Sequence, residues 1–178
     1  TSCFYSSMGL AWAGTIRADL ITEQILGAQD LLGLLAAEGS GSLRADQAVR
    51  SAGRLVARAH EKGLYHADLN LKNILIRPGD RRAEAYLLDL DQSLFRPRLP
   101  RPEKERNLLR LYRSYLKMAF PKRADPRPAL RFLLAYAPRD RAFRRSLVRR
   151  AQRGGDKWHR WHWRMRERVF GSRYARSR

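Results

Sequence analysis

The sequence predicts an α+β fold in which a few short strands flank a polar loop and helices make up most of the remainder. Residues 8–25 alternate between apolar and polar around Gly14, as two short strands of a hairpin do. A polar loop over residues 66–73 leads into two apolar runs. Apolar residues then recur three and four positions apart over residues 43–62 and again from residue 103, which is the spacing of amphipathic helices.

The part of the chain after the hairpin predicts a short helix followed by a long one. Asp30 precedes the stretch LLGLLAAE, a short helix that we expect to end in the turn at residues 39–41. Ser42 is placed to cap the long helix over residues 43–62. Gly63 is suited to the left-handed conformation that ends such a helix.

Two apolar runs follow the polar loop and predict a pair of strands. They cover residues 74–76 and 85–90 and are separated by a turn that contains Pro78 and Gly79. In this prediction Asp89 lies near the end of the second strand.

The second half of the chain is predicted to be helical. One helix begins near Glu103 and is interrupted by Pro121. Further helices are expected over residues 127–136, 140–152 and 156–170.

Composition indicates one folded domain. The chain has 178 residues, of which 44% are hydrophobic and 30% are charged. The single cysteine, Cys3, excludes an internal disulfide, so a reducing cytoplasm suits the protein. No apolar stretch approaches the length of a membrane span, and the start of the chain lacks a signal-peptide layout. We therefore expect a soluble or peripheral protein.

Charge is distributed unevenly along the chain. Residues 1–95 hold 10 Lys and Arg against 11 Asp and Glu, whereas residues 96–178 hold 27 against 6. The second segment therefore carries the whole excess of +20. Such a surface implies an anionic partner, namely nucleic acid, an acidic lipid surface or a substrate with phosphates and carboxylates.

The polar loop and the second strand carry residue types that phosphoryl transfer requires. That reaction needs oxygen ligands for a metal ion on the phosphates and a carboxylate beside the acceptor hydroxyl. Asp68 is the candidate to accept the proton of that hydroxyl. Asn73 and Asp89 are the candidate Mg²⁺ ligands, because Mg²⁺ prefers hard oxygen donors. His66 is expected to anchor the loop through its ring or simply to pack, and Asp91 is either a further ligand or a cap.

The motifs HADLNLKN and YLLDLDQ resemble the catalytic loop and metal-binding motif of the protein-kinase-like superfamily. The sequence departs from the usual pattern in three places. Ala67 replaces an arginine, Asn70 replaces a lysine, and Asp-Leu-Asp replaces Asp-Phe-Gly. The resemblance implies a protein-kinase-like fold with a mostly helical C-terminal lobe. The missing arginine argues against an activation loop under its control.

Within that superfamily, the segments RADLITEQI, GAQDL, HADLN and LLDLDQ resemble the 3-deoxy-D-manno-octulosonic acid (Kdo) kinases of the lipopolysaccharide kinase family. The resemblance implies phosphorylation of a Kdo hydroxyl on the lipid A inner core by ATP and Mg²⁺. It also implies a peripheral location on the cytoplasmic side of the bacterial inner membrane. By the same likeness, the hinge that meets adenine includes Thr22, Glu23 and Gln24. Asp30 either reaches the ribose or caps the helix that follows it.

The N-terminal lobe of a kinase is largely absent from this sequence. Only 21 residues precede Thr22, none of the first 61 residues is lysine, and no Gly-rich phosphate loop is found. We therefore expect residues 1–26 to be a remnant of N-lobe strands and hinge. Residues 27–178 would form a kinase-like C-lobe with a basic helical C-terminal region. A truncated product, a fragment or a mis-started reading frame explains this pattern, and the activity of such a chain is expected to be low.

Two other functions fit parts of the same pattern. Aminoglycoside and choline phosphotransferases share the His-x-Asp and Asp-x-Asp motifs, but they bind cationic acceptors in acidic pockets. A degenerate kinase fold acting as a basic RNA-binding module would account for the charge. The Trp-rich segment 158–163 interleaves aromatics with cations, yet Trp158 and Trp161 fall at helical spacing and favour packing. The basic half is expected to dock on anionic lipid, and nucleic acid is the less favoured partner.

Overall fold

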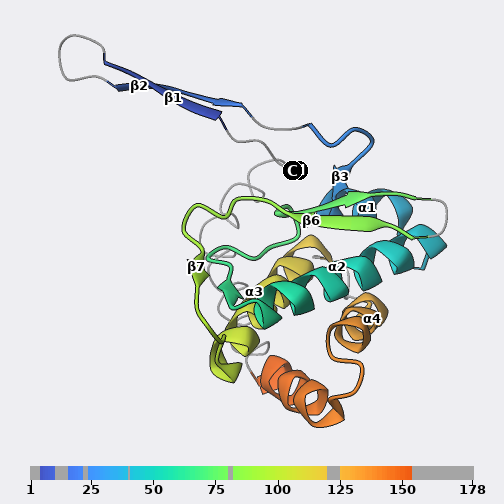
Figure 1. Ribbon diagram of the computed structural model, residues 1–178. Helices are drawn as coiled ribbons and strands as arrows, with labels where there is room; N and C mark the ends of the chain where they lie inside the picture. The colour runs from blue at the N-terminus through green and yellow to red at the C-terminus, as the bar shows by residue number, and fades with distance from the viewer. Residues whose placement is uncertain are drawn as a thin grey trace, which may run out of the picture.

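The computed structural model describes residues 5–10, 16–21, 24–39, 41–79, 82–119 and 125–153. The chain begins with an antiparallel hairpin of β1 (Tyr5–Leu10) and β2 (Ile16–Ile21), in which Tyr5 lies opposite Ile21. In Figure 1 this hairpin extends away from the helices. The predicted hairpin is confirmed, although it covers residues 5–21 and not the predicted range of 8–25.

Two small sheets frame the polar loop. The first is antiparallel, with the order β3 (Gln29–Asp30), β5 (Ile74–Arg77) and β6 (Glu84–Leu87). The second pairs β4 (Leu64–Tyr65) with β7 (Leu94–Phe95). Periodicity gave no sign of β3, β4 and β7, since each contains only two residues.

The second strand of the predicted pair is shorter than expected. β6 ends at Leu87, so Leu88, Asp89 and Leu90 lie beyond it and are exposed. The apolar leucines lengthened the prediction, but Asp89 has a φ of 58°. This left-handed conformation is incompatible with a strand and turns the chain away from β5.

The helices follow the predicted pattern closely. They are α1 (Leu31–Glu38), α2 (Leu43–Glu61), α3 (Arg101–Ala119), α4 (Pro126–Tyr136) and a last helix over residues 141–153. Asp30 caps α1 by accepting a bond from Gly33 N at 2.8 Å, and Ser42 caps α2 through Ala45 N at 3.0 Å. Gly63 follows α2 with a φ of 81°, as predicted.

The core is built around α2. Figure 1 shows this helix between the β5–β6 sheet and α4, with α3 alongside. The buried apolar residues come mainly from α1, α2, β5, the polar loop, α3, α4 and the last helix; among the most deeply buried are Leu31, Ala45, Ala48, Ala52, Val56, Leu69, Ile74 and Ile76. Burial of this one cluster fixes the loop to the helical lobe.

The crossing of α2 and α4 depends on Gly53. A Cβ at this position would lie 2.7 Å from the carbonyl oxygen of Phe132 and 3.0 Å from Cβ of Ala135. We expect Gly53→Ala to lower the free energy of unfolding by about 1–3 kcal/mol, because backbone of α4 must move away. The cost of moving the α4 backbone is thus expected to outweigh the stabilisation of about 1 kcal/mol that alanine has over glycine in a helix.

Urea unfolding measures this effect, with Gly41→Ala as the matched control. Gly41 has open space around its Cβ position, so that variant should unfold close to the wild type. Equal stability of the two variants would contradict the close approach of α2 and α4.

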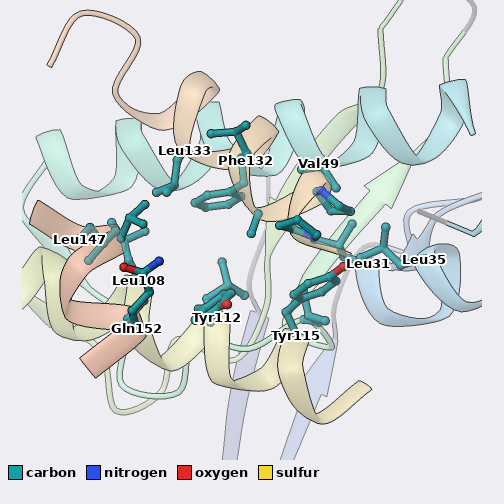
Figure 2. A pocket seen from close by; sticks show the side chains of 18 residues that line it. Leu31, Leu35, Val49, Leu108, Tyr112, Tyr115, Phe132, Leu133, Leu147 and Gln152 are labelled. Carbon is teal, nitrogen blue, oxygen red and sulfur yellow. The ribbon is translucent and has the colours of Figure 1, made fainter. Parts of the chain in front are cut away.

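An apolar pocket lies between α3, α4 and the last helix (Figure 2). Its volume is about 330 Å³, and its walls include Leu108 and Tyr112 of α3, Phe132 and Leu133 of α4, and Leu147. Leu71 of the polar loop also lines it. The lining is mainly apolar, and the presence of Leu71 in it shows that the polar loop lies against the core.

Basic residues are exposed on the described part of the second half, as the charge distribution indicated. They include Arg106 and Arg113 on α3, and Arg141, Arg145 and Arg149 on the last helix. None of the helices within the described segments is both long and apolar enough to cross a membrane. The predicted helix over residues 156–170, with its tryptophans, lies outside the described residues.

Candidate active site

The polar loop between β4 and β5, residues 66–73, is held in one shape by its own side chains. We call it the Asp68 loop. Asn70 Oδ1 accepts bonds from the backbone N–H groups of Lys72 at 2.8 Å and Asn73 at 3.1 Å. Asn70 Nδ2 donates to Asp68 Oδ2 at 2.9 Å. Asparagine thus closes a turn and orients a carboxylate at the same time.

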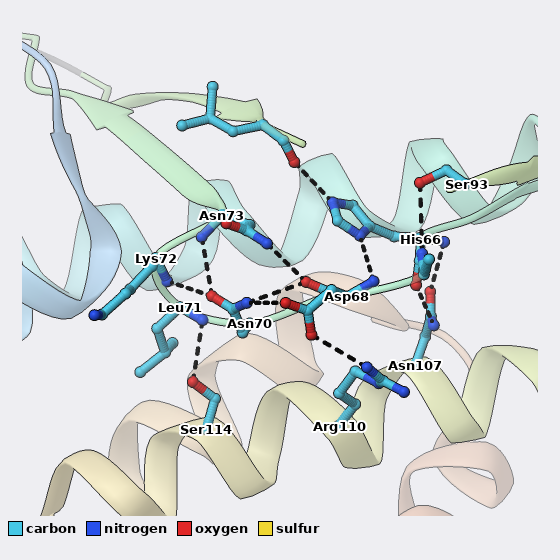
Figure 3. Close-up of polar contacts among 12 residues, drawn as sticks. His66, Asp68, Asn70, Leu71, Lys72, Asn73, Ser93, Asn107, Arg110 and Ser114 are labelled. Carbon is cyan, nitrogen blue, oxygen red and sulfur yellow. Dashed lines mark hydrogen bonds and ion pairs between the residues drawn. The ribbon is translucent and has the colours of Figure 1, made fainter. Parts of the chain in front are cut away.

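His66 connects the two halves of the site. Its Nδ1 accepts a bond from the backbone N–H of Asp68 at 3.1 Å, so Nε2 carries the proton and donates to the Leu88 carbonyl at 2.9 Å (Figure 3). The side chain is only 2% exposed. The expectation that His66 anchors the loop through its ring agrees with this geometry, because both ring nitrogens are engaged in holding backbone.

Asn73 and Asp89 are brought together by the same strands. Ile74 pairs with Leu87 in the β5–β6 ladder, and the Leu88 N–H donates to the Asn73 carbonyl at 2.9 Å. Asp89 is the next residue along the chain. Asn73 Nδ2 in turn donates to the Asp68 carbonyl at 2.9 Å. Two hydrogen bonds therefore connect Asp68 through Asn73 to Leu88, the residue that precedes Asp89.

The donor set fits a hard divalent cation. Because Asn73 uses its Nδ2 to hold Asp68, its Oδ1 remains to act as a ligand, and the Asp89 carboxylate lies on an exposed turn. Among the described residues there is no cluster of three or more His, Cys, Asp or Glu able to hold a metal ion. This poses no conflict for Mg²⁺, which typically takes one or two protein ligands and completes its shell with phosphates and water.

One side of α3 positions the Asp68 loop at three points (Figure 3). Asn107 accepts a bond from the His66 N–H at 3.1 Å and donates to the His66 carbonyl at 2.9 Å. Arg110 Nη1 donates to Asp68 Oδ1 at 3.1 Å. Ser114 accepts a bond from the Leu71 N–H at 3.2 Å.

Sequence reasoning missed Asn107, Arg110 and Ser114, because they are more than 40 positions from the loop residues that they contact. The available signal was their spacing in the segment NLLRLYRS, where three polar residues three and four positions apart share one side of the predicted helix.

Behind Asn107 lies a buried histidine. His60 Nε2 donates to Asn107 Oδ1 at 3.3 Å, and His60 Nδ1 accepts a bond from the Tyr136 hydroxyl at 2.7 Å. Asn107 is 0% exposed. Burial lowers the pKa of His60 to about 4, and the Asn107 bond opposes that shift without cancelling it.

This shift makes stability depend on pH. The pKa of His60 is about 4 in the fold and lies below its ordinary value of 6.5, so the unfolded chain binds more protons between these values. The stability that neutral His60 contributes is therefore present above pH 6.5 and is lost as the pH falls through 4. We expect this loss to be about 3 kcal/mol. Urea unfolding of wild type and His60→Gln at several pH values measures it, and parallel profiles for the two proteins would contradict it.

The structure describes only part of the predicted nucleotide hinge. Thr22 and Glu23 lie outside the described residues, and Gln24 is exposed. Asp30 caps α1, which agrees with one of its two predicted roles; its reach to a ribose is untested. Asp91 lies on the exposed turn after Asp89.

Comparisons with known proteins agree on one family. A family model described as the lipopolysaccharide kinase (Kdo/WaaP) family matches residues 6–136. The chain is 38% identical over 106 residues to a protein of Actinobacillus succinogenes named 3-deoxy-D-manno-octulosonic acid kinase. This match covers 60% of this chain and 42% of that protein. The chain is 36% identical over 118 residues to a protein of the same name from Stenotrophomonas maltophilia, covering 66% and 42%. The chain spans about two-fifths of the length of these curated relatives.

A solved structure confirms the fold. The structure titled "WaaP in complex with acyl carrier protein" matches with a TM-score of 0.59 and 20% identity, over 86% of this chain and 68% of that one. The predicted α+β, protein-kinase-like fold is thereby confirmed.

Proposed function

The chain belongs to the lipopolysaccharide kinase (Kdo/WaaP) family, and we propose that it carries the catalytic residues of an ATP-dependent kinase that phosphorylates a Kdo hydroxyl of the lipopolysaccharide inner core. The observation that carries the proposal is that two hydrogen bonds bring Asp68, Asn73 and the residue before Asp89 together: Asn73 Nδ2 donates to the Asp68 carbonyl, and Leu88 N donates to the Asn73 carbonyl. The names of the curated relatives supply the acceptor.

Asp68 holds and activates the acceptor in this proposal. Its carboxylate orients the sugar hydroxyl and takes up its proton as the hydroxyl oxygen bonds to the γ-phosphorus of ATP. The bond between that phosphorus and the bridging oxygen breaks, and ADP leaves. Asn70 and Arg110 keep the carboxylate in one orientation before the acceptor arrives, so little reorganisation is needed during the reaction.

Asn73 and Asp89 would hold Mg²⁺ through Oδ1 and the carboxylate. A bound Mg²⁺ supplies neutralisation of the charge on the nucleotide phosphates. His66 donates to the carbonyl of Leu88, the residue immediately before Asp89, and Asp89 itself has a left-handed backbone conformation. Through Leu88, His66 therefore sets the position of the Asp89 ligand.

We further propose the predicted division of the chain. Residues 1–26 would be a remnant of N-lobe strands and hinge, with Thr22, Glu23 and Gln24 beside adenine and Asp30 near the ribose. Residues 27–178 would be the C-lobe. The extended β1–β2 hairpin and the helical body built on α2 are consistent with this division.

The basic second half would bind the anionic surface of the inner membrane on its cytoplasmic side, as a peripheral protein. The excess of cations after residue 95 and the exposed arginines of α3 and the last helix support this proposal. Each Lys or Arg near an anionic surface contributes about 1 kcal/mol of binding.

The test is a transfer assay with radiolabelled ATP, Mg²⁺ and Kdo-lipid A. The proposal predicts label on the lipid that depends on both Mg²⁺ and Kdo, with no label on lipid A that lacks Kdo. Transfer to an aminoglycoside or to choline in place of Kdo-lipid A would identify a different small-molecule kinase. RNA binding without transfer to any acceptor would reject the kinase proposal.

A further inference from the structure

Arg110 contacts the carboxylate of Asp68, the proposed base, and uses one of its N–H donors to do so. Arg110 Nη1 bonds to Asp68 Oδ1 at 3.1 Å, and the two side chains are 41% and 58% exposed. A guanidinium carries five N–H donors in one plane. Within the part of the chain that the structure describes, Asp68 is the partner of this guanidinium, so its other donors remain available to a ligand that lies next to Asp68.

Stability does not explain this contact. An ion pair between exposed side chains contributes between 0 and about 1 kcal/mol. The Asp68 loop is already held by His66 and Asn70 from within, and by Asn107 and Ser114 from α3. A further long, charged side chain is therefore not needed to fix the loop.

The surroundings of Arg110 favour an anion. Arg106 and Arg113 are exposed and lie four residues before and three after Arg110, so the three arginines share one face of α3. Within the loop, the Asn70 side chain is uncharged, and both its amide nitrogen and its amide oxygen already make hydrogen bonds to other loop residues. Arg110 thus supplies the guanidinium that contacts Asp68 (Figure 3). Of the three arginines on this face, it is the one bonded to the Asp68 loop.

We infer that Arg110 binds the carboxylate of the acceptor sugar acid and so selects acceptors that carry an anionic group beside the reacting hydroxyl. The inference rests on the proposed function. The hydroxyl must come within hydrogen-bond distance of Asp68, which brings the rest of the same sugar to Arg110. A planar guanidinium suits a carboxylate, which it can bind through two parallel hydrogen bonds.

This arrangement makes two carboxylates share one cation. Asp68 repels the carboxylate of the acceptor and also occupies one donor of Arg110. Asp68→Asn should therefore keep or tighten acceptor binding even though it removes the base. Arg110→Gln should weaken binding. A residue that merely supports the fold would not give effects of opposite sign.

Calorimetric titration of the whole chain with free Kdo and with Kdo methyl ester tests the inference. The ester has the same sugar without the charge. Wild type should bind the acid about tenfold more tightly than the ester. Arg110→Gln should bind acid and ester alike. Arg113→Gln removes one arginine from the same face of α3 and should keep the preference for the acid, as should Asp68→Asn.

Equal binding of acid and ester by wild type, or no binding of either, overturns the inference. So does an equal loss of preference for the acid over the ester in Arg113→Gln and Arg110→Gln.

Transfer kinetics separate this inference from the proposed function. If wild type labels Kdo-lipid A and Arg110→Gln lowers kcat with an unchanged KM for the acceptor, Arg110 only orients Asp68 and the proposed function stands. If wild type labels no Kdo-lipid A, the proposed function fails.

Discussion

We expect Asp68→Asn to lower the rate of transfer to Kdo-lipid A by about 10³-fold, because the acceptor hydroxyl loses the carboxylate that takes its proton. The substitution keeps the size of the side chain and leaves an oxygen to accept the bond from Arg110. Since Asp68 is largely exposed and contributes its backbone rather than its carboxylate to the bonds with His66 and Asn73, the fold should be unchanged. The transfer assay and urea unfolding are measured on the same preparation.

Glu38→Gln is the matched control for the lost charge. Glu38 pairs with Arg44 at the surface, 3.2 Å away, and lies on α1. This variant should retain full transfer. A rate for Asp68→Asn within threefold of the wild type would show that Asp68 is not the base.

We expect Asp89→Ala to lower transfer by about 10²-fold or more, because Asn73 then remains as the one proposed protein ligand of the ion that stabilises the phosphate charge. The positive φ of Asp89 makes alanine slightly strained there, so Asp89→Asn provides a second variant that tolerates the same conformation. Both variants should lose activity.

Asp91→Ala removes a carboxylate two residues further along the same exposed turn. We expect its rate to stay well above that of Asp89→Ala. If Asp91→Ala were as inactive as Asp89→Ala while Asp89→Asn kept its activity, the ligand would be Asp91, and the assignment of Asp89 would be wrong.

The helices were predictable because their signals are local. In α2, apolar spacing, a serine cap and a terminal glycine all pointed to the same bounds, and each of these acts within a few residues of the helix end. The motif spacing around the Asp68 loop is local as well, so Asp68, Asn73 and Asp89 could be proposed as site residues from the sequence; their roles stay predictions.

The limits of the prediction have equally definite causes. Leu87, Leu88 and Leu90 are apolar enough for a strand, but Leu88 gives its carbonyl to His66 and Asp89 adopts a left-handed conformation, so the strand ends at Leu87. Asn107 and Arg110 contact the loop across 41 and 42 positions of sequence. Their helix could be predicted from periodicity, yet which face of it would meet the loop depended on how α3 packs in three dimensions.

These long-range contacts explain how the exposed carboxylate of Asp68, the proposed base, can lie on a well-ordered loop. The carboxylate of Asp68 is open to solvent, whereas His66, which accepts a bond from the Asp68 backbone N–H, and Asn107, which holds His66, are buried. Asn107 joins the loop to His60 of α2, and His60 joins it to Tyr136 of α4. Three helices thereby share in positioning one loop.

Metal-dependent nucleotide binding tests most directly whether Asn73 and Asp89 hold one ion. Mn²⁺–ATP binding is measured by electron paramagnetic resonance for wild type, Asn73→Ala, Asp89→Ala and the double variant. We expect each single substitution to weaken binding about tenfold and the double variant to be little worse than either, because both ligands serve the same ion. Metal-free ATP should bind all four proteins alike. Fully additive losses, or Mn²⁺–ATP binding that neither substitution changes, would contradict a shared metal site.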